Sequence, residues 1–350
     1  MRVAHCATVA PNRCGLYGTT RDLISAEVKY GIDAGILNVG TSDKEPLING
    51  LQEGYPKVKD KSVDVKSYEW AKEADVCIRH SYIPVELQNS GKVLLLALHG
   101  RPESSFRLEQ SRQHAIMTTV QKRAADDRYK GFLVFWKEYM LHWSTLVPAK
   151  KLFYVPAPVD LDYYSPKGEK FDFGENAGSP NILIADIWRE DVLPFNLIYA
   201  ALLFQQKYCK TAKIHISALQ GNNFKVMSGT LIGIKATGAL GTINPITNKI
   251  NDLYRAADIV ITPHTIATRI VRESLACGTP VVAGAGNKYT PYTASPMDTE
   301  SFAKAINNCW EDYRQSPTEV RAMARKTAEV AFNFDNTGKA MKAVLERVAG

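Results

Sequence analysis

The sequence lacks a long hydrophobic run and the usual marks of a secreted, membrane or metal-binding protein. No apolar stretch approaches the roughly 20 residues that a membrane-spanning helix needs. The first ten residues, MRVAHCATVA, are too short and too quickly polar for a signal peptide. The six cysteines are scattered, with no CxxC pair and no Cys/His cluster at metal-ligand spacing. We therefore expect a soluble cytoplasmic protein with reduced thiols and no metal site.

The first glycine-containing segment lacks the spacing of a dinucleotide-binding motif. It reads PNRCGLYGTT, over residues 11–20, and follows an apolar strand pattern. Gly15 and Gly18 do not form G-x-G-x-x-G, and no acidic residue follows at the dinucleotide spacing, so hydride transfer is poorly supported. The two glycines either form a simple turn or let a ligand approach backbone amides at a helix N-terminus.

Charge is unevenly distributed along the chain. The formal net charge is +7 over 350 residues, and residues 101–151 contain ten Lys and Arg but five Asp and Glu. This segment is either a solvated helical face or a surface for an anionic acceptor such as nucleic acid or lipid head groups. Within it, residues 131–151 mix aromatic and basic side chains. That mixture predicts a long amphipathic helix packed on the core, with membrane contact or base stacking as alternatives.

Short apolar strands alternate with helical periodicity throughout the sequence, which predicts parallel sheets covered by helices on both faces. In the first half, a helix is predicted at 19–31, and strands are predicted at 2–10, 33–40, 74–81, 92–100 and 151–159. In the second half, strands are predicted at 181–187, 212–219, 233–240, 257–264 and 279–285. Helices are predicted between them at 193–208, 242–257 and 268–278, and in the C-terminal region from about residue 299.

A polar stretch rich in glycine and proline, residues 163–180, separates the two halves. The predicted fold class is α/β, with two doubly wound, Rossmann-like domains facing a cleft. We expect the first domain over residues 1–160 and the second over 161–332, with a terminal helix near 333–350 that packs back on the first. Ligands bind such sheets at the carboxyl ends of their strands.

Two neighbouring strands predicted in the first domain end in histidine. His80 follows one strand, and His99 follows the next, just before Gly100 and Arg101. A histidine at a strand end often makes only structural hydrogen bonds, but two at one sheet edge favour contact with a ligand. We place His80 and Arg101 among the candidate acceptor contacts.

In the second domain, the helix predicted at 268–278 carries Glu273. A charged side chain facing a buried sheet would be costly without a partner. A carboxylate aimed into the cleft could instead accept two hydrogen bonds from a vicinal diol such as a ribose. An exposed glutamate on an amphipathic helix is the alternative.

The segments YRAADIVITPH and RESLACGTPVVA, within residues 254–283, resemble the donor-binding region of retaining glycosyltransferases of the family-4 type. These enzymes, also called group 1 transferases, have the fold named GT-B. Residues 154–166, YVPAPVDLDYYSP, look like the segment that joins their two domains. The glycine segment and the two strands ending in histidine are similar in order, so the resemblance covers most of the chain.

The resemblance implies a nucleotide-sugar donor, with a UDP-sugar such as UDP-glucose expected, bound mainly by the second domain and without a metal. Glu273 matches the glutamate that holds the donor ribose, and His99 matches the histidine near the transferred sugar. Gly241 and Thr242 match a turn that contacts the base, and Gly15 matches the loop that faces the diphosphate. The predicted donor contacts are Gly15, Gly18, Gly241, Thr242, His264, Arg269 and Glu273.

Three positions depart from the family pattern. Thr265 stands where the family has the first glutamate of its Glu-x7-Glu motif, and Ala157–Pro158 replaces Asn-Gly between the domains. After the first strand of the second domain, Arg189 is the only cation where the family has an Arg and a Lys. We predict His99, Arg189 and Thr265 as the catalytic set, with Arg189 or Arg269 stabilising the leaving diphosphate.

The acceptor stays open between a lipid-linked sugar, a small-molecule glycan or metabolite, a protein, and a modified base in DNA. The positive net charge favours a polyanionic acceptor, which includes DNA modification at a hydroxymethylated base. No obligate protein partner is expected. Because two motif positions differ, the alternative is a catalytically inactive GT-B protein that binds nucleotide or glycan.

Overall fold

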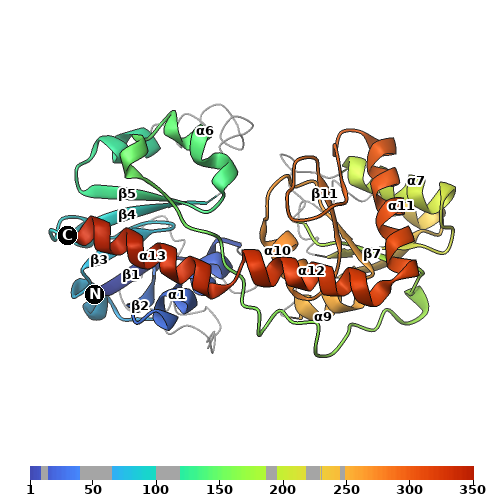
Figure 1. Cartoon of the computed structure of the whole chain (residues 1–350), viewed down its shortest axis with the longest axis horizontal. Coiled ribbons are helices and arrows are strands. Elements are labelled where there is room, and N and C mark those ends of the chain that lie inside the picture. The colour runs from blue at the N-terminus through green and yellow to red at the C-terminus, as the bar shows by residue number, and fades with distance from the viewer. Residues whose placement is uncertain are drawn as a thin grey trace. The chain divides into compact units, whose positions relative to one another are not determined.

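The structure is a computed structural model that describes most of the chain. The described residues are 1–8, 15–39, 65–99, 119–186, 195–217, 229, 231–244 and 249–350. They form two compact units (Figure 1). The first unit comprises Met1–Pro158 with Phe332–Gly350, and the second unit comprises Val159–Ala331. Each unit is built on a parallel sheet, so the predicted α/β class is confirmed.

The first unit contains a six-stranded sheet in the order β2-β1-β3-β4-β5-β6. All neighbouring strands run parallel. Because β2 and β3 lie on opposite sides of β1, the winding direction reverses between β1 and β3. The strands are β1 (Arg2–Ala7), β2 (Asp33–Asn38), β3 (Val76–Arg79), β4 (Val93–Leu98), β5 (Tyr129–Val134) and β6 (Leu152–Tyr154).

Helices α1 (Gly15–Lys29) and α13 (Phe334–Ala349) contact each other on one face of this sheet (Figure 1). Leu23 of α1 and Met341 of α13 belong to the same buried core as Ile78 and Leu95 of the strands. The unit's other described helical segments are α2 (Tyr68–Lys72), α3 (Val85–Gln88), residues 119–125, η1 (Lys137–Tyr139), α6 (Met140–Ser144) and η2 (Ala149–Lys151).

The second unit contains a parallel sheet in the order β12-β11-β10-β7-β8-β9. Its winding direction reverses between β7 and β10, which lie side by side at the centre. Ligands of doubly wound sheets bind beyond the carboxyl ends of the strands at such a reversal. The strands are β7 (Asn181–Ile184), β8 (Lys213–Ser217), β9 (Leu240–Asn244), β10 (Ile259–Ile261), β11 (Val281–Gly284) and β12 (Thr293–Ala294).

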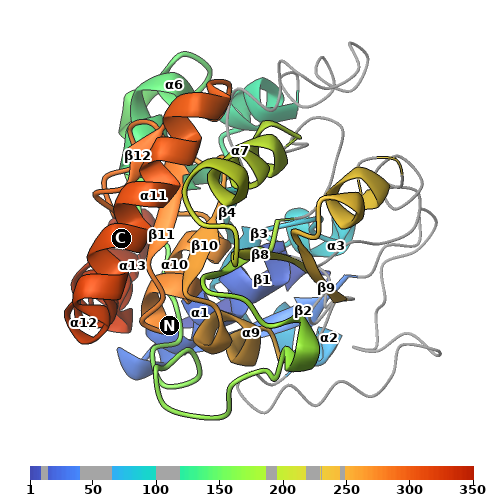
Figure 2. The ribbon, with the colours of Figure 1, turned by 90° about the vertical axis from the view of Figure 1, so that its right-hand side faces the viewer.

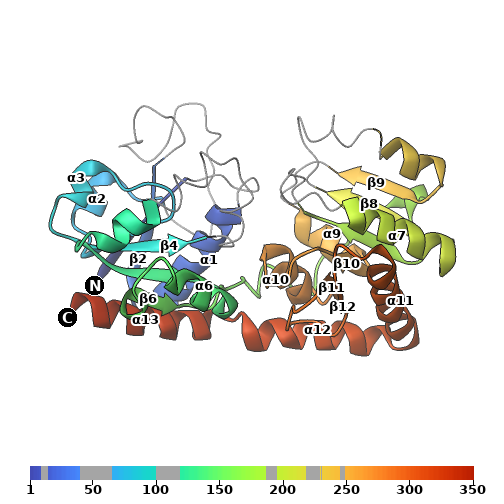
Figure 3. The same cartoon turned by 90° about the horizontal axis from the view of Figure 1, so that it is seen from above.

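Helices cover both faces of this second sheet. On one face, α7 (Phe195–Lys207) and α11 (Thr299–Gln315) lie side by side (Figures 2 and 3) and bury Phe204 and Phe302 against Ile182. Since alternate strand residues point to opposite faces, Leu183 faces the other side. There α10 contacts β11 and two neighbouring helices. These helices are α9 (Ile250–Ala256), α10 (Arg269–Ala276) and α12 (Pro317–Ala331).

The prediction of a long amphipathic helix over residues 131–151 is wrong. This stretch contains most of β5, two short 3-10 helices and the five-residue α6. Its first residues, GFLVF, form the continuous apolar run expected of a strand buried on both faces. Phe132 and Leu133 point to opposite faces, and both are fully buried between β4 and β6.

Three further predictions of local structure differ from the fold. Residues 231–236 are helical, so the strand predicted at 233–240 starts at Leu240 instead. Gly238, at φ +75°, follows that helix in the left-handed conformation that commonly ends one. Of the helix predicted at 242–257, only α9 is present as an α-helix among the described residues. The first part of that range, up to Asn244, belongs to β9. Gly15 and Gly18, expected in a loop, lie in the first turn of α1.

Candidate functional site

An Asp–His pair lies at the carboxyl end of the central strands of the second sheet. Asp186 follows β7 and His264 follows β10, the two strands between which the winding reverses. His264 Nε2 lies 2.8 Å from Asp186 Oδ1, and the Thr262 hydroxyl donates to Asp186 Oδ2 at 2.7 Å. Nδ1 of His264 is buried without a hydrogen-bond partner among the described residues. The pair therefore fixes the ring and leaves one nitrogen for a further group.

The N-terminus of α10 lies just beyond this pair. Its cap residue is Thr268, whose side chain makes no capping hydrogen bond. The Thr268 hydroxyl is buried and has no partner in the described part of the chain. The first N–H groups of a helix have no partner within the helix, and the helix dipole favours an anion there. Together these donors can bind a phosphate group.

The loop between β10 and α10 is held in place by β11 and the residues after it. Gly284 N donates to the His264 carbonyl at 3.1 Å, and the Asn287 amide donates to the carbonyls of His264 and Ile266 at 3.1 and 3.2 Å. A Cβ at Gly284 would collide with the Pro263 carbonyl. The loop that presents His264 is thus fixed before any ligand binds.

Glu273 lies on α10 and is buried, with 5% of its surface exposed. The Arg269 guanidinium pairs with Glu273 Oε1, and its Nε donates at 2.6 Å. The Tyr254 hydroxyl donates to Glu273 Oε2 at 3.3 Å. Burial, then the charge of Glu273, raises the pKa of the Tyr254 phenol well above its usual value, so it remains a donor. Arg269 also donates to the Tyr164 hydroxyl at 3.1 Å.

The other catalytic, acceptor and donor residues predicted from sequence are less clearly placed. Thr265 is exposed in the loop before α10. Arg189 and Arg101 lie outside the described residues. The turn predicted at Gly241 and Thr242 is not present, because both residues lie inside β9. Their role as base contacts stays a prediction.

Gly241 and Thr242 pack on a buried histidine of the neighbouring strand β8, His215. A Cβ at Gly241 would collide with its ring, and Thr242 N donates to its Nδ1 at 3.1 Å. The Phe173 ring stacks on the His215 ring, at 3.7 Å between centroids. Burial, with a smaller contribution from Lys213, lowers the pKa of His215 to about 4, so the ring stays neutral and can accept that bond.

In the first unit, the two predicted histidines meet beside the strand ends. His80 follows β3, His99 follows β4, and Nδ1 of His80 lies 2.7 Å from Nε2 of His99. Their placement on neighbouring parallel strands agrees with the prediction. His80 is buried, and its Nε2 lies 2.9 Å from Nδ1 of His5, whereas His99 is half-buried. Both nitrogens of His80 therefore have protein partners, and the contact of either histidine with a ligand stays a prediction.

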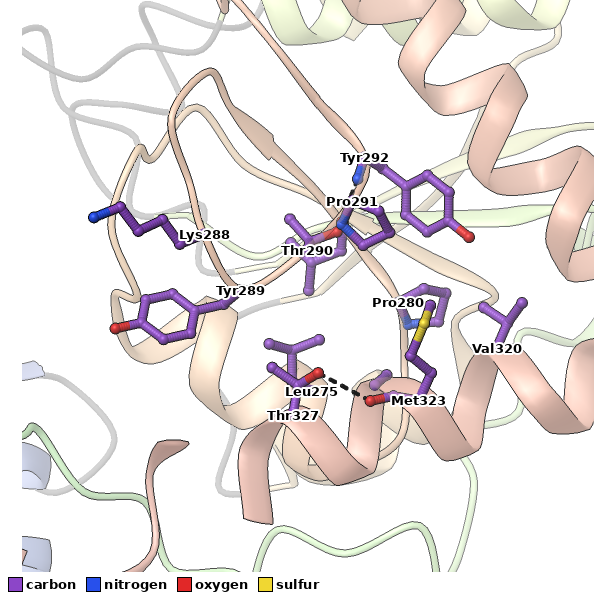
Figure 4. A pocket seen from close by; sticks show the side chains of 12 residues that line it. Leu275, Pro280, Lys288, Tyr289, Thr290, Pro291, Tyr292, Val320, Met323 and Thr327 are labelled. Atoms are coloured by element: carbon purple, nitrogen blue, oxygen red, sulfur yellow. Dashed lines mark hydrogen bonds between the residues drawn. The ribbon is translucent and has the colours of Figure 1, made fainter. Parts of the chain in front are cut away.

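An apolar pocket of about 320 Å³ lies elsewhere in the second unit (Figure 4). It is bordered by α12, the end of α10 and the segment after β11, with Met323, Leu275 and Tyr289 among its lining residues. None of the predicted donor contacts lines it. It lacks the convergent charged groups that a nucleotide diphosphate requires, so we do not place the donor there.

Sequence reasoning missed several members of these clusters. Asp186 stands at the end of a predicted strand, so its position alone could have identified it as a candidate site residue. Thr268 was not noticed because an absent capping bond leaves no trace in a sequence. Within the described ranges, no cluster of three or more His, Cys, Asp or Glu side chains could hold a metal ion. None of the helices in those ranges is long and apolar enough to cross a membrane.

Several solved structures share this architecture. Anabaena HepE in complex with UDP-glucose matches with a TM-score of 0.71 and 15% identity, covering 99% of this chain and 100% of that one. WaaG, a glycosyltransferase involved in lipopolysaccharide biosynthesis, gives 0.66 and 14%, covering 99% and 100%. A glycosyltransferase from Rickettsia africae gives 0.68 and 14%, covering 99% and 98%.

The chain has the GT-B fold. At identities near 15%, the likeness establishes the GT-B fold alone, and the family-4 assignment stays a prediction. The sequence matches no protein-family model. It also matches no curated protein.

Proposed function

We propose that this protein is a glycosyltransferase that transfers a hexose from a nucleotide sugar, with retention, to an acceptor hydroxyl. The observation that carries the proposal is the pairing, on α10, of an N-terminal anion site with the buried carboxylate of Glu273. The five helical steps from Thr268 to Glu273 rise about 7.5 Å along the helix. That spacing suits a nucleoside diphosphate whose phosphates lie at the helix end and whose ribose diol meets the carboxylate. HepE, which shares the fold, was solved with UDP-glucose.

The contacts of Glu273 suggest how a donor would bind. A carboxylate offers about four acceptor positions. Arg269 occupies those on Oε1, and Tyr254 occupies one on Oε2. A diol that donates to both oxygens therefore displaces part of the Arg269 contact. The released guanidinium can then turn toward the diphosphate, where its positive charge would offset the negative charge of the phosphates.

The reaction breaks the bond between the anomeric carbon and the diphosphate oxygen, so negative charge grows on the leaving diphosphate. The amides of α10, the Thr268 hydroxyl and Arg269 would stabilise that charge, and Arg189 is a further predicted cation. A preorganised donor typically contributes about 3–4 kcal/mol to such a transition state. His264, paired with Asp186, can donate from Nδ1 when it is protonated, a state that a nearby diphosphate favours.

The sugar and the acceptor are assigned to the first unit and the loop before α10. His99 and Thr265 are proposed to contact the transferred hexose. No metal is proposed, because amides and cations can supply the positive charge. The acceptor is proposed to be polyanionic or carried on an anionic surface, given the net charge of +7. A hydroxymethylated DNA base, a lipid-linked sugar and a small-molecule glycan are the candidates to test.

A donor-hydrolysis screen tests the proposal. The purified protein is incubated with UDP-, GDP- and ADP-sugars, and released nucleotide is measured. We expect slow release from one UDP-hexose, with the α-configured product seen by NMR if configuration is retained. Binding of hydroxymethylated DNA that weakens steeply with salt would support the DNA acceptor. Nucleotide binding without turnover would instead favour the inactive binding protein.

Glu273→Gln is the decisive variant, because it keeps the shape of the side chain but removes its charge. We expect nucleotide affinity to fall about 10-fold or more, as hydrogen bonds to charged groups are worth about 1.5–3 kcal/mol. The matched control is Glu329→Gln on α12, since Glu329 pairs with Arg325 at the same helical spacing. If both variants bind nucleotide like the parent protein, Glu273 does not hold the ribose and the proposal fails.

A further inference from the structure

Asn287 in the second unit is buried, and each polar group of its side chain is hydrogen-bonded. The residue is 4% exposed. Its Nδ2 donates to the His264 carbonyl at 3.1 Å and to the Ile266 carbonyl at 3.2 Å. Its Oδ1 accepts from Tyr289 N at 3.0 Å. Since the two carbonyls only accept and the Tyr289 N–H only donates, these contacts fix which amide atom is the nitrogen.

A tight turn after β11 brings Asn287 to the loop before α10. Strand β11 ends at Gly284, and Asn287 N donates to the Gly284 carbonyl at 3.1 Å, which closes a four-residue turn. Its third residue, Gly286, has φ +90°, the left-handed region that the third position of a type II turn requires. Because β11 and β10 are neighbours in the sheet, the turn that follows β11 lies beside the loop that follows β10.

The two bonds from Asn287 set the orientation of two peptide groups in that loop. A trans peptide is planar, so its N–H points opposite to its carbonyl. Holding the carbonyls of His264 and Ile266 toward Asn287 therefore turns the N–H groups of Thr265 and Ala267 to the other side of the loop. Thr265 is exposed, and its N–H makes no hydrogen bond with any described residue. The loop thus presents backbone donors on the side away from Asn287.

An asparagine suits this position better than other side chains of its size. An amide offers two N–H donors and an acceptor, whereas an ionised aspartate offers acceptors only and would set an oxygen against the two carbonyls. A leucine would leave the Tyr289 N–H without this acceptor, at the cost of an unsatisfied buried group. No other described side chain bonds the carbonyl of His264 or Ile266. The side-chain support of the loop at these carbonyls therefore depends on one amide.

We propose that Asn287 is a positioning residue for the donor diphosphate. It holds the loop before α10 so that the outward N–H groups of the loop face the phosphates. The inference rests on the proposed function, which places the diphosphate at the N-terminus of α10. Nδ1 of His264, buried without a partner in the described ranges, belongs to the same loop. Donors oriented in advance cost no reorganisation when negative charge arrives or grows beside them.

The contacts proposed for the rest of the nucleotide do not depend on Asn287. Glu273, proposed to hold the ribose, is bonded by Arg269 and Tyr254. Gly241, a predicted base contact, lies on β9 at the far edge of the sheet, four strands from β11. Because Asn287 acts through the loop and not by touching the ligand, its effect belongs to the phosphates. A change at Asn287 should therefore weaken ligands that carry phosphates and spare the nucleoside.

Asn287→Asp tests this role in the full chain. Calorimetry measures the affinity for UDP and inorganic pyrophosphate, and an NMR titration measures that for uridine. We expect UDP and pyrophosphate affinity to fall about 10-fold or more and uridine affinity to stay within about 2-fold of the parent value. Asn287→Ser, which keeps one donor, should give a smaller loss of the same kind and serves if the first variant does not fold. The control is Gln205→Glu, because Gln205 is a buried amide on α7 that donates to the Lys210 carbonyl at 3.1 Å.

The ratio of UDP to uridine affinity separates positioning from general support of the fold. Gln205→Glu should lose stability and keep the parent ratio. An unchanged ratio in the folded Asn287 variants, or the same fall in ratio in the control, would overturn the inference. If the parent protein binds pyrophosphate but no nucleotide, the proposed function fails, and the pyrophosphate affinity of the variants still decides the role of Asn287. If it binds neither, there is no anion site to position and both proposals fail.

Discussion

Two buried polar atoms are the main evidence for a ligand site in the second unit. Nδ1 of His264 and the Thr268 hydroxyl are both enclosed without a partner in the described ranges, which is unusual because most buried polar groups are hydrogen-bonded. The sequence could predict that Glu273 needs a partner, but not that Tyr254, 19 positions away on another helix, provides one. Such pairings depend on how helices pack, and a single sequence does not contain that information.

Removing the Thr268 hydroxyl should weaken ligand binding without weakening the fold. Thr268→Val keeps the side-chain shape and removes a hydroxyl that has no capping bond to lose. We expect the free energy of unfolding to stay within about 0.5 kcal/mol of the parent value. UDP affinity should fall about 10-fold, because a hydrogen bond to a charged phosphate is lost. Urea unfolding and isothermal titration calorimetry measure the two quantities.

Thr279→Val is the matched control for that variant. The Thr279 hydroxyl is also buried, but it donates to the Tyr254 carbonyl at 2.5 Å. Its removal should destabilise the second unit by about 1–3 kcal/mol, because the carbonyl loses its donor, and leave UDP affinity nearly unchanged. Equal effects of the two variants on affinity would show that Thr268 has no direct part in binding.

Among the helices and strands, the sequence predicted best those with a clear apolar period. The strands that became β1, β2, β3, β4, β7 and β8, and the helices that became α1, α7 and α10, were identified within a few residues. The failures were an apolar run that fits either a strand or a buried helix, as in β5, and glycines that could end either element. Gly238 ends a helix rather than interrupting a strand, and only its tertiary setting decides that.

Glycine substitutions in the second unit test this distinction. Gly241→Ala places a methyl group against the His215 ring, which β8 and Phe173 hold in place. We expect a loss of about 1–3 kcal/mol in stability, as in other overpacked interiors. Gly233→Ala, within the helix at 231–236, meets open space and should stabilise by roughly 0.5–1 kcal/mol. Urea unfolding monitored by circular dichroism measures the change in the free energy of unfolding for each variant. The prediction requires a decrease for Gly241→Ala and an increase for Gly233→Ala.

At the scale of the whole molecule, the chain passes between the two units twice. It leaves the first unit after Pro158 and returns to it at Phe332. Helix α13 then packs on α1, and the Thr337 hydroxyl donates to the Pro156 carbonyl at 2.8 Å. The first unit is therefore assembled from two segments that are distant in sequence, whereas the second is one continuous segment.

Met341→Ala tests how far the first unit depends on α13. Met341 is fully buried in the core shared with α1. Its truncation should destabilise the first unit by about 2–5 kcal/mol. Hydrogen exchange measured by mass spectrometry should show faster exchange in β1, β3 and α1, but not in β7 or α11. Met323→Ala, at a side chain that is 45% exposed on α12, should leave both units within about 0.5 kcal/mol. An equal increase in hydrogen exchange in both units of Met341→Ala would contradict the division of the chain into two separately stabilised units.

This double passage sets an order for synthesis on the ribosome. Nascent domains usually fold as they emerge, beginning with the amino-terminal one. Here every residue of the second unit leaves the exit tunnel before α13, which belongs to the first unit. The core of the first unit therefore stays incomplete, with the surface of α1 uncovered, until α13 has emerged from the ribosome.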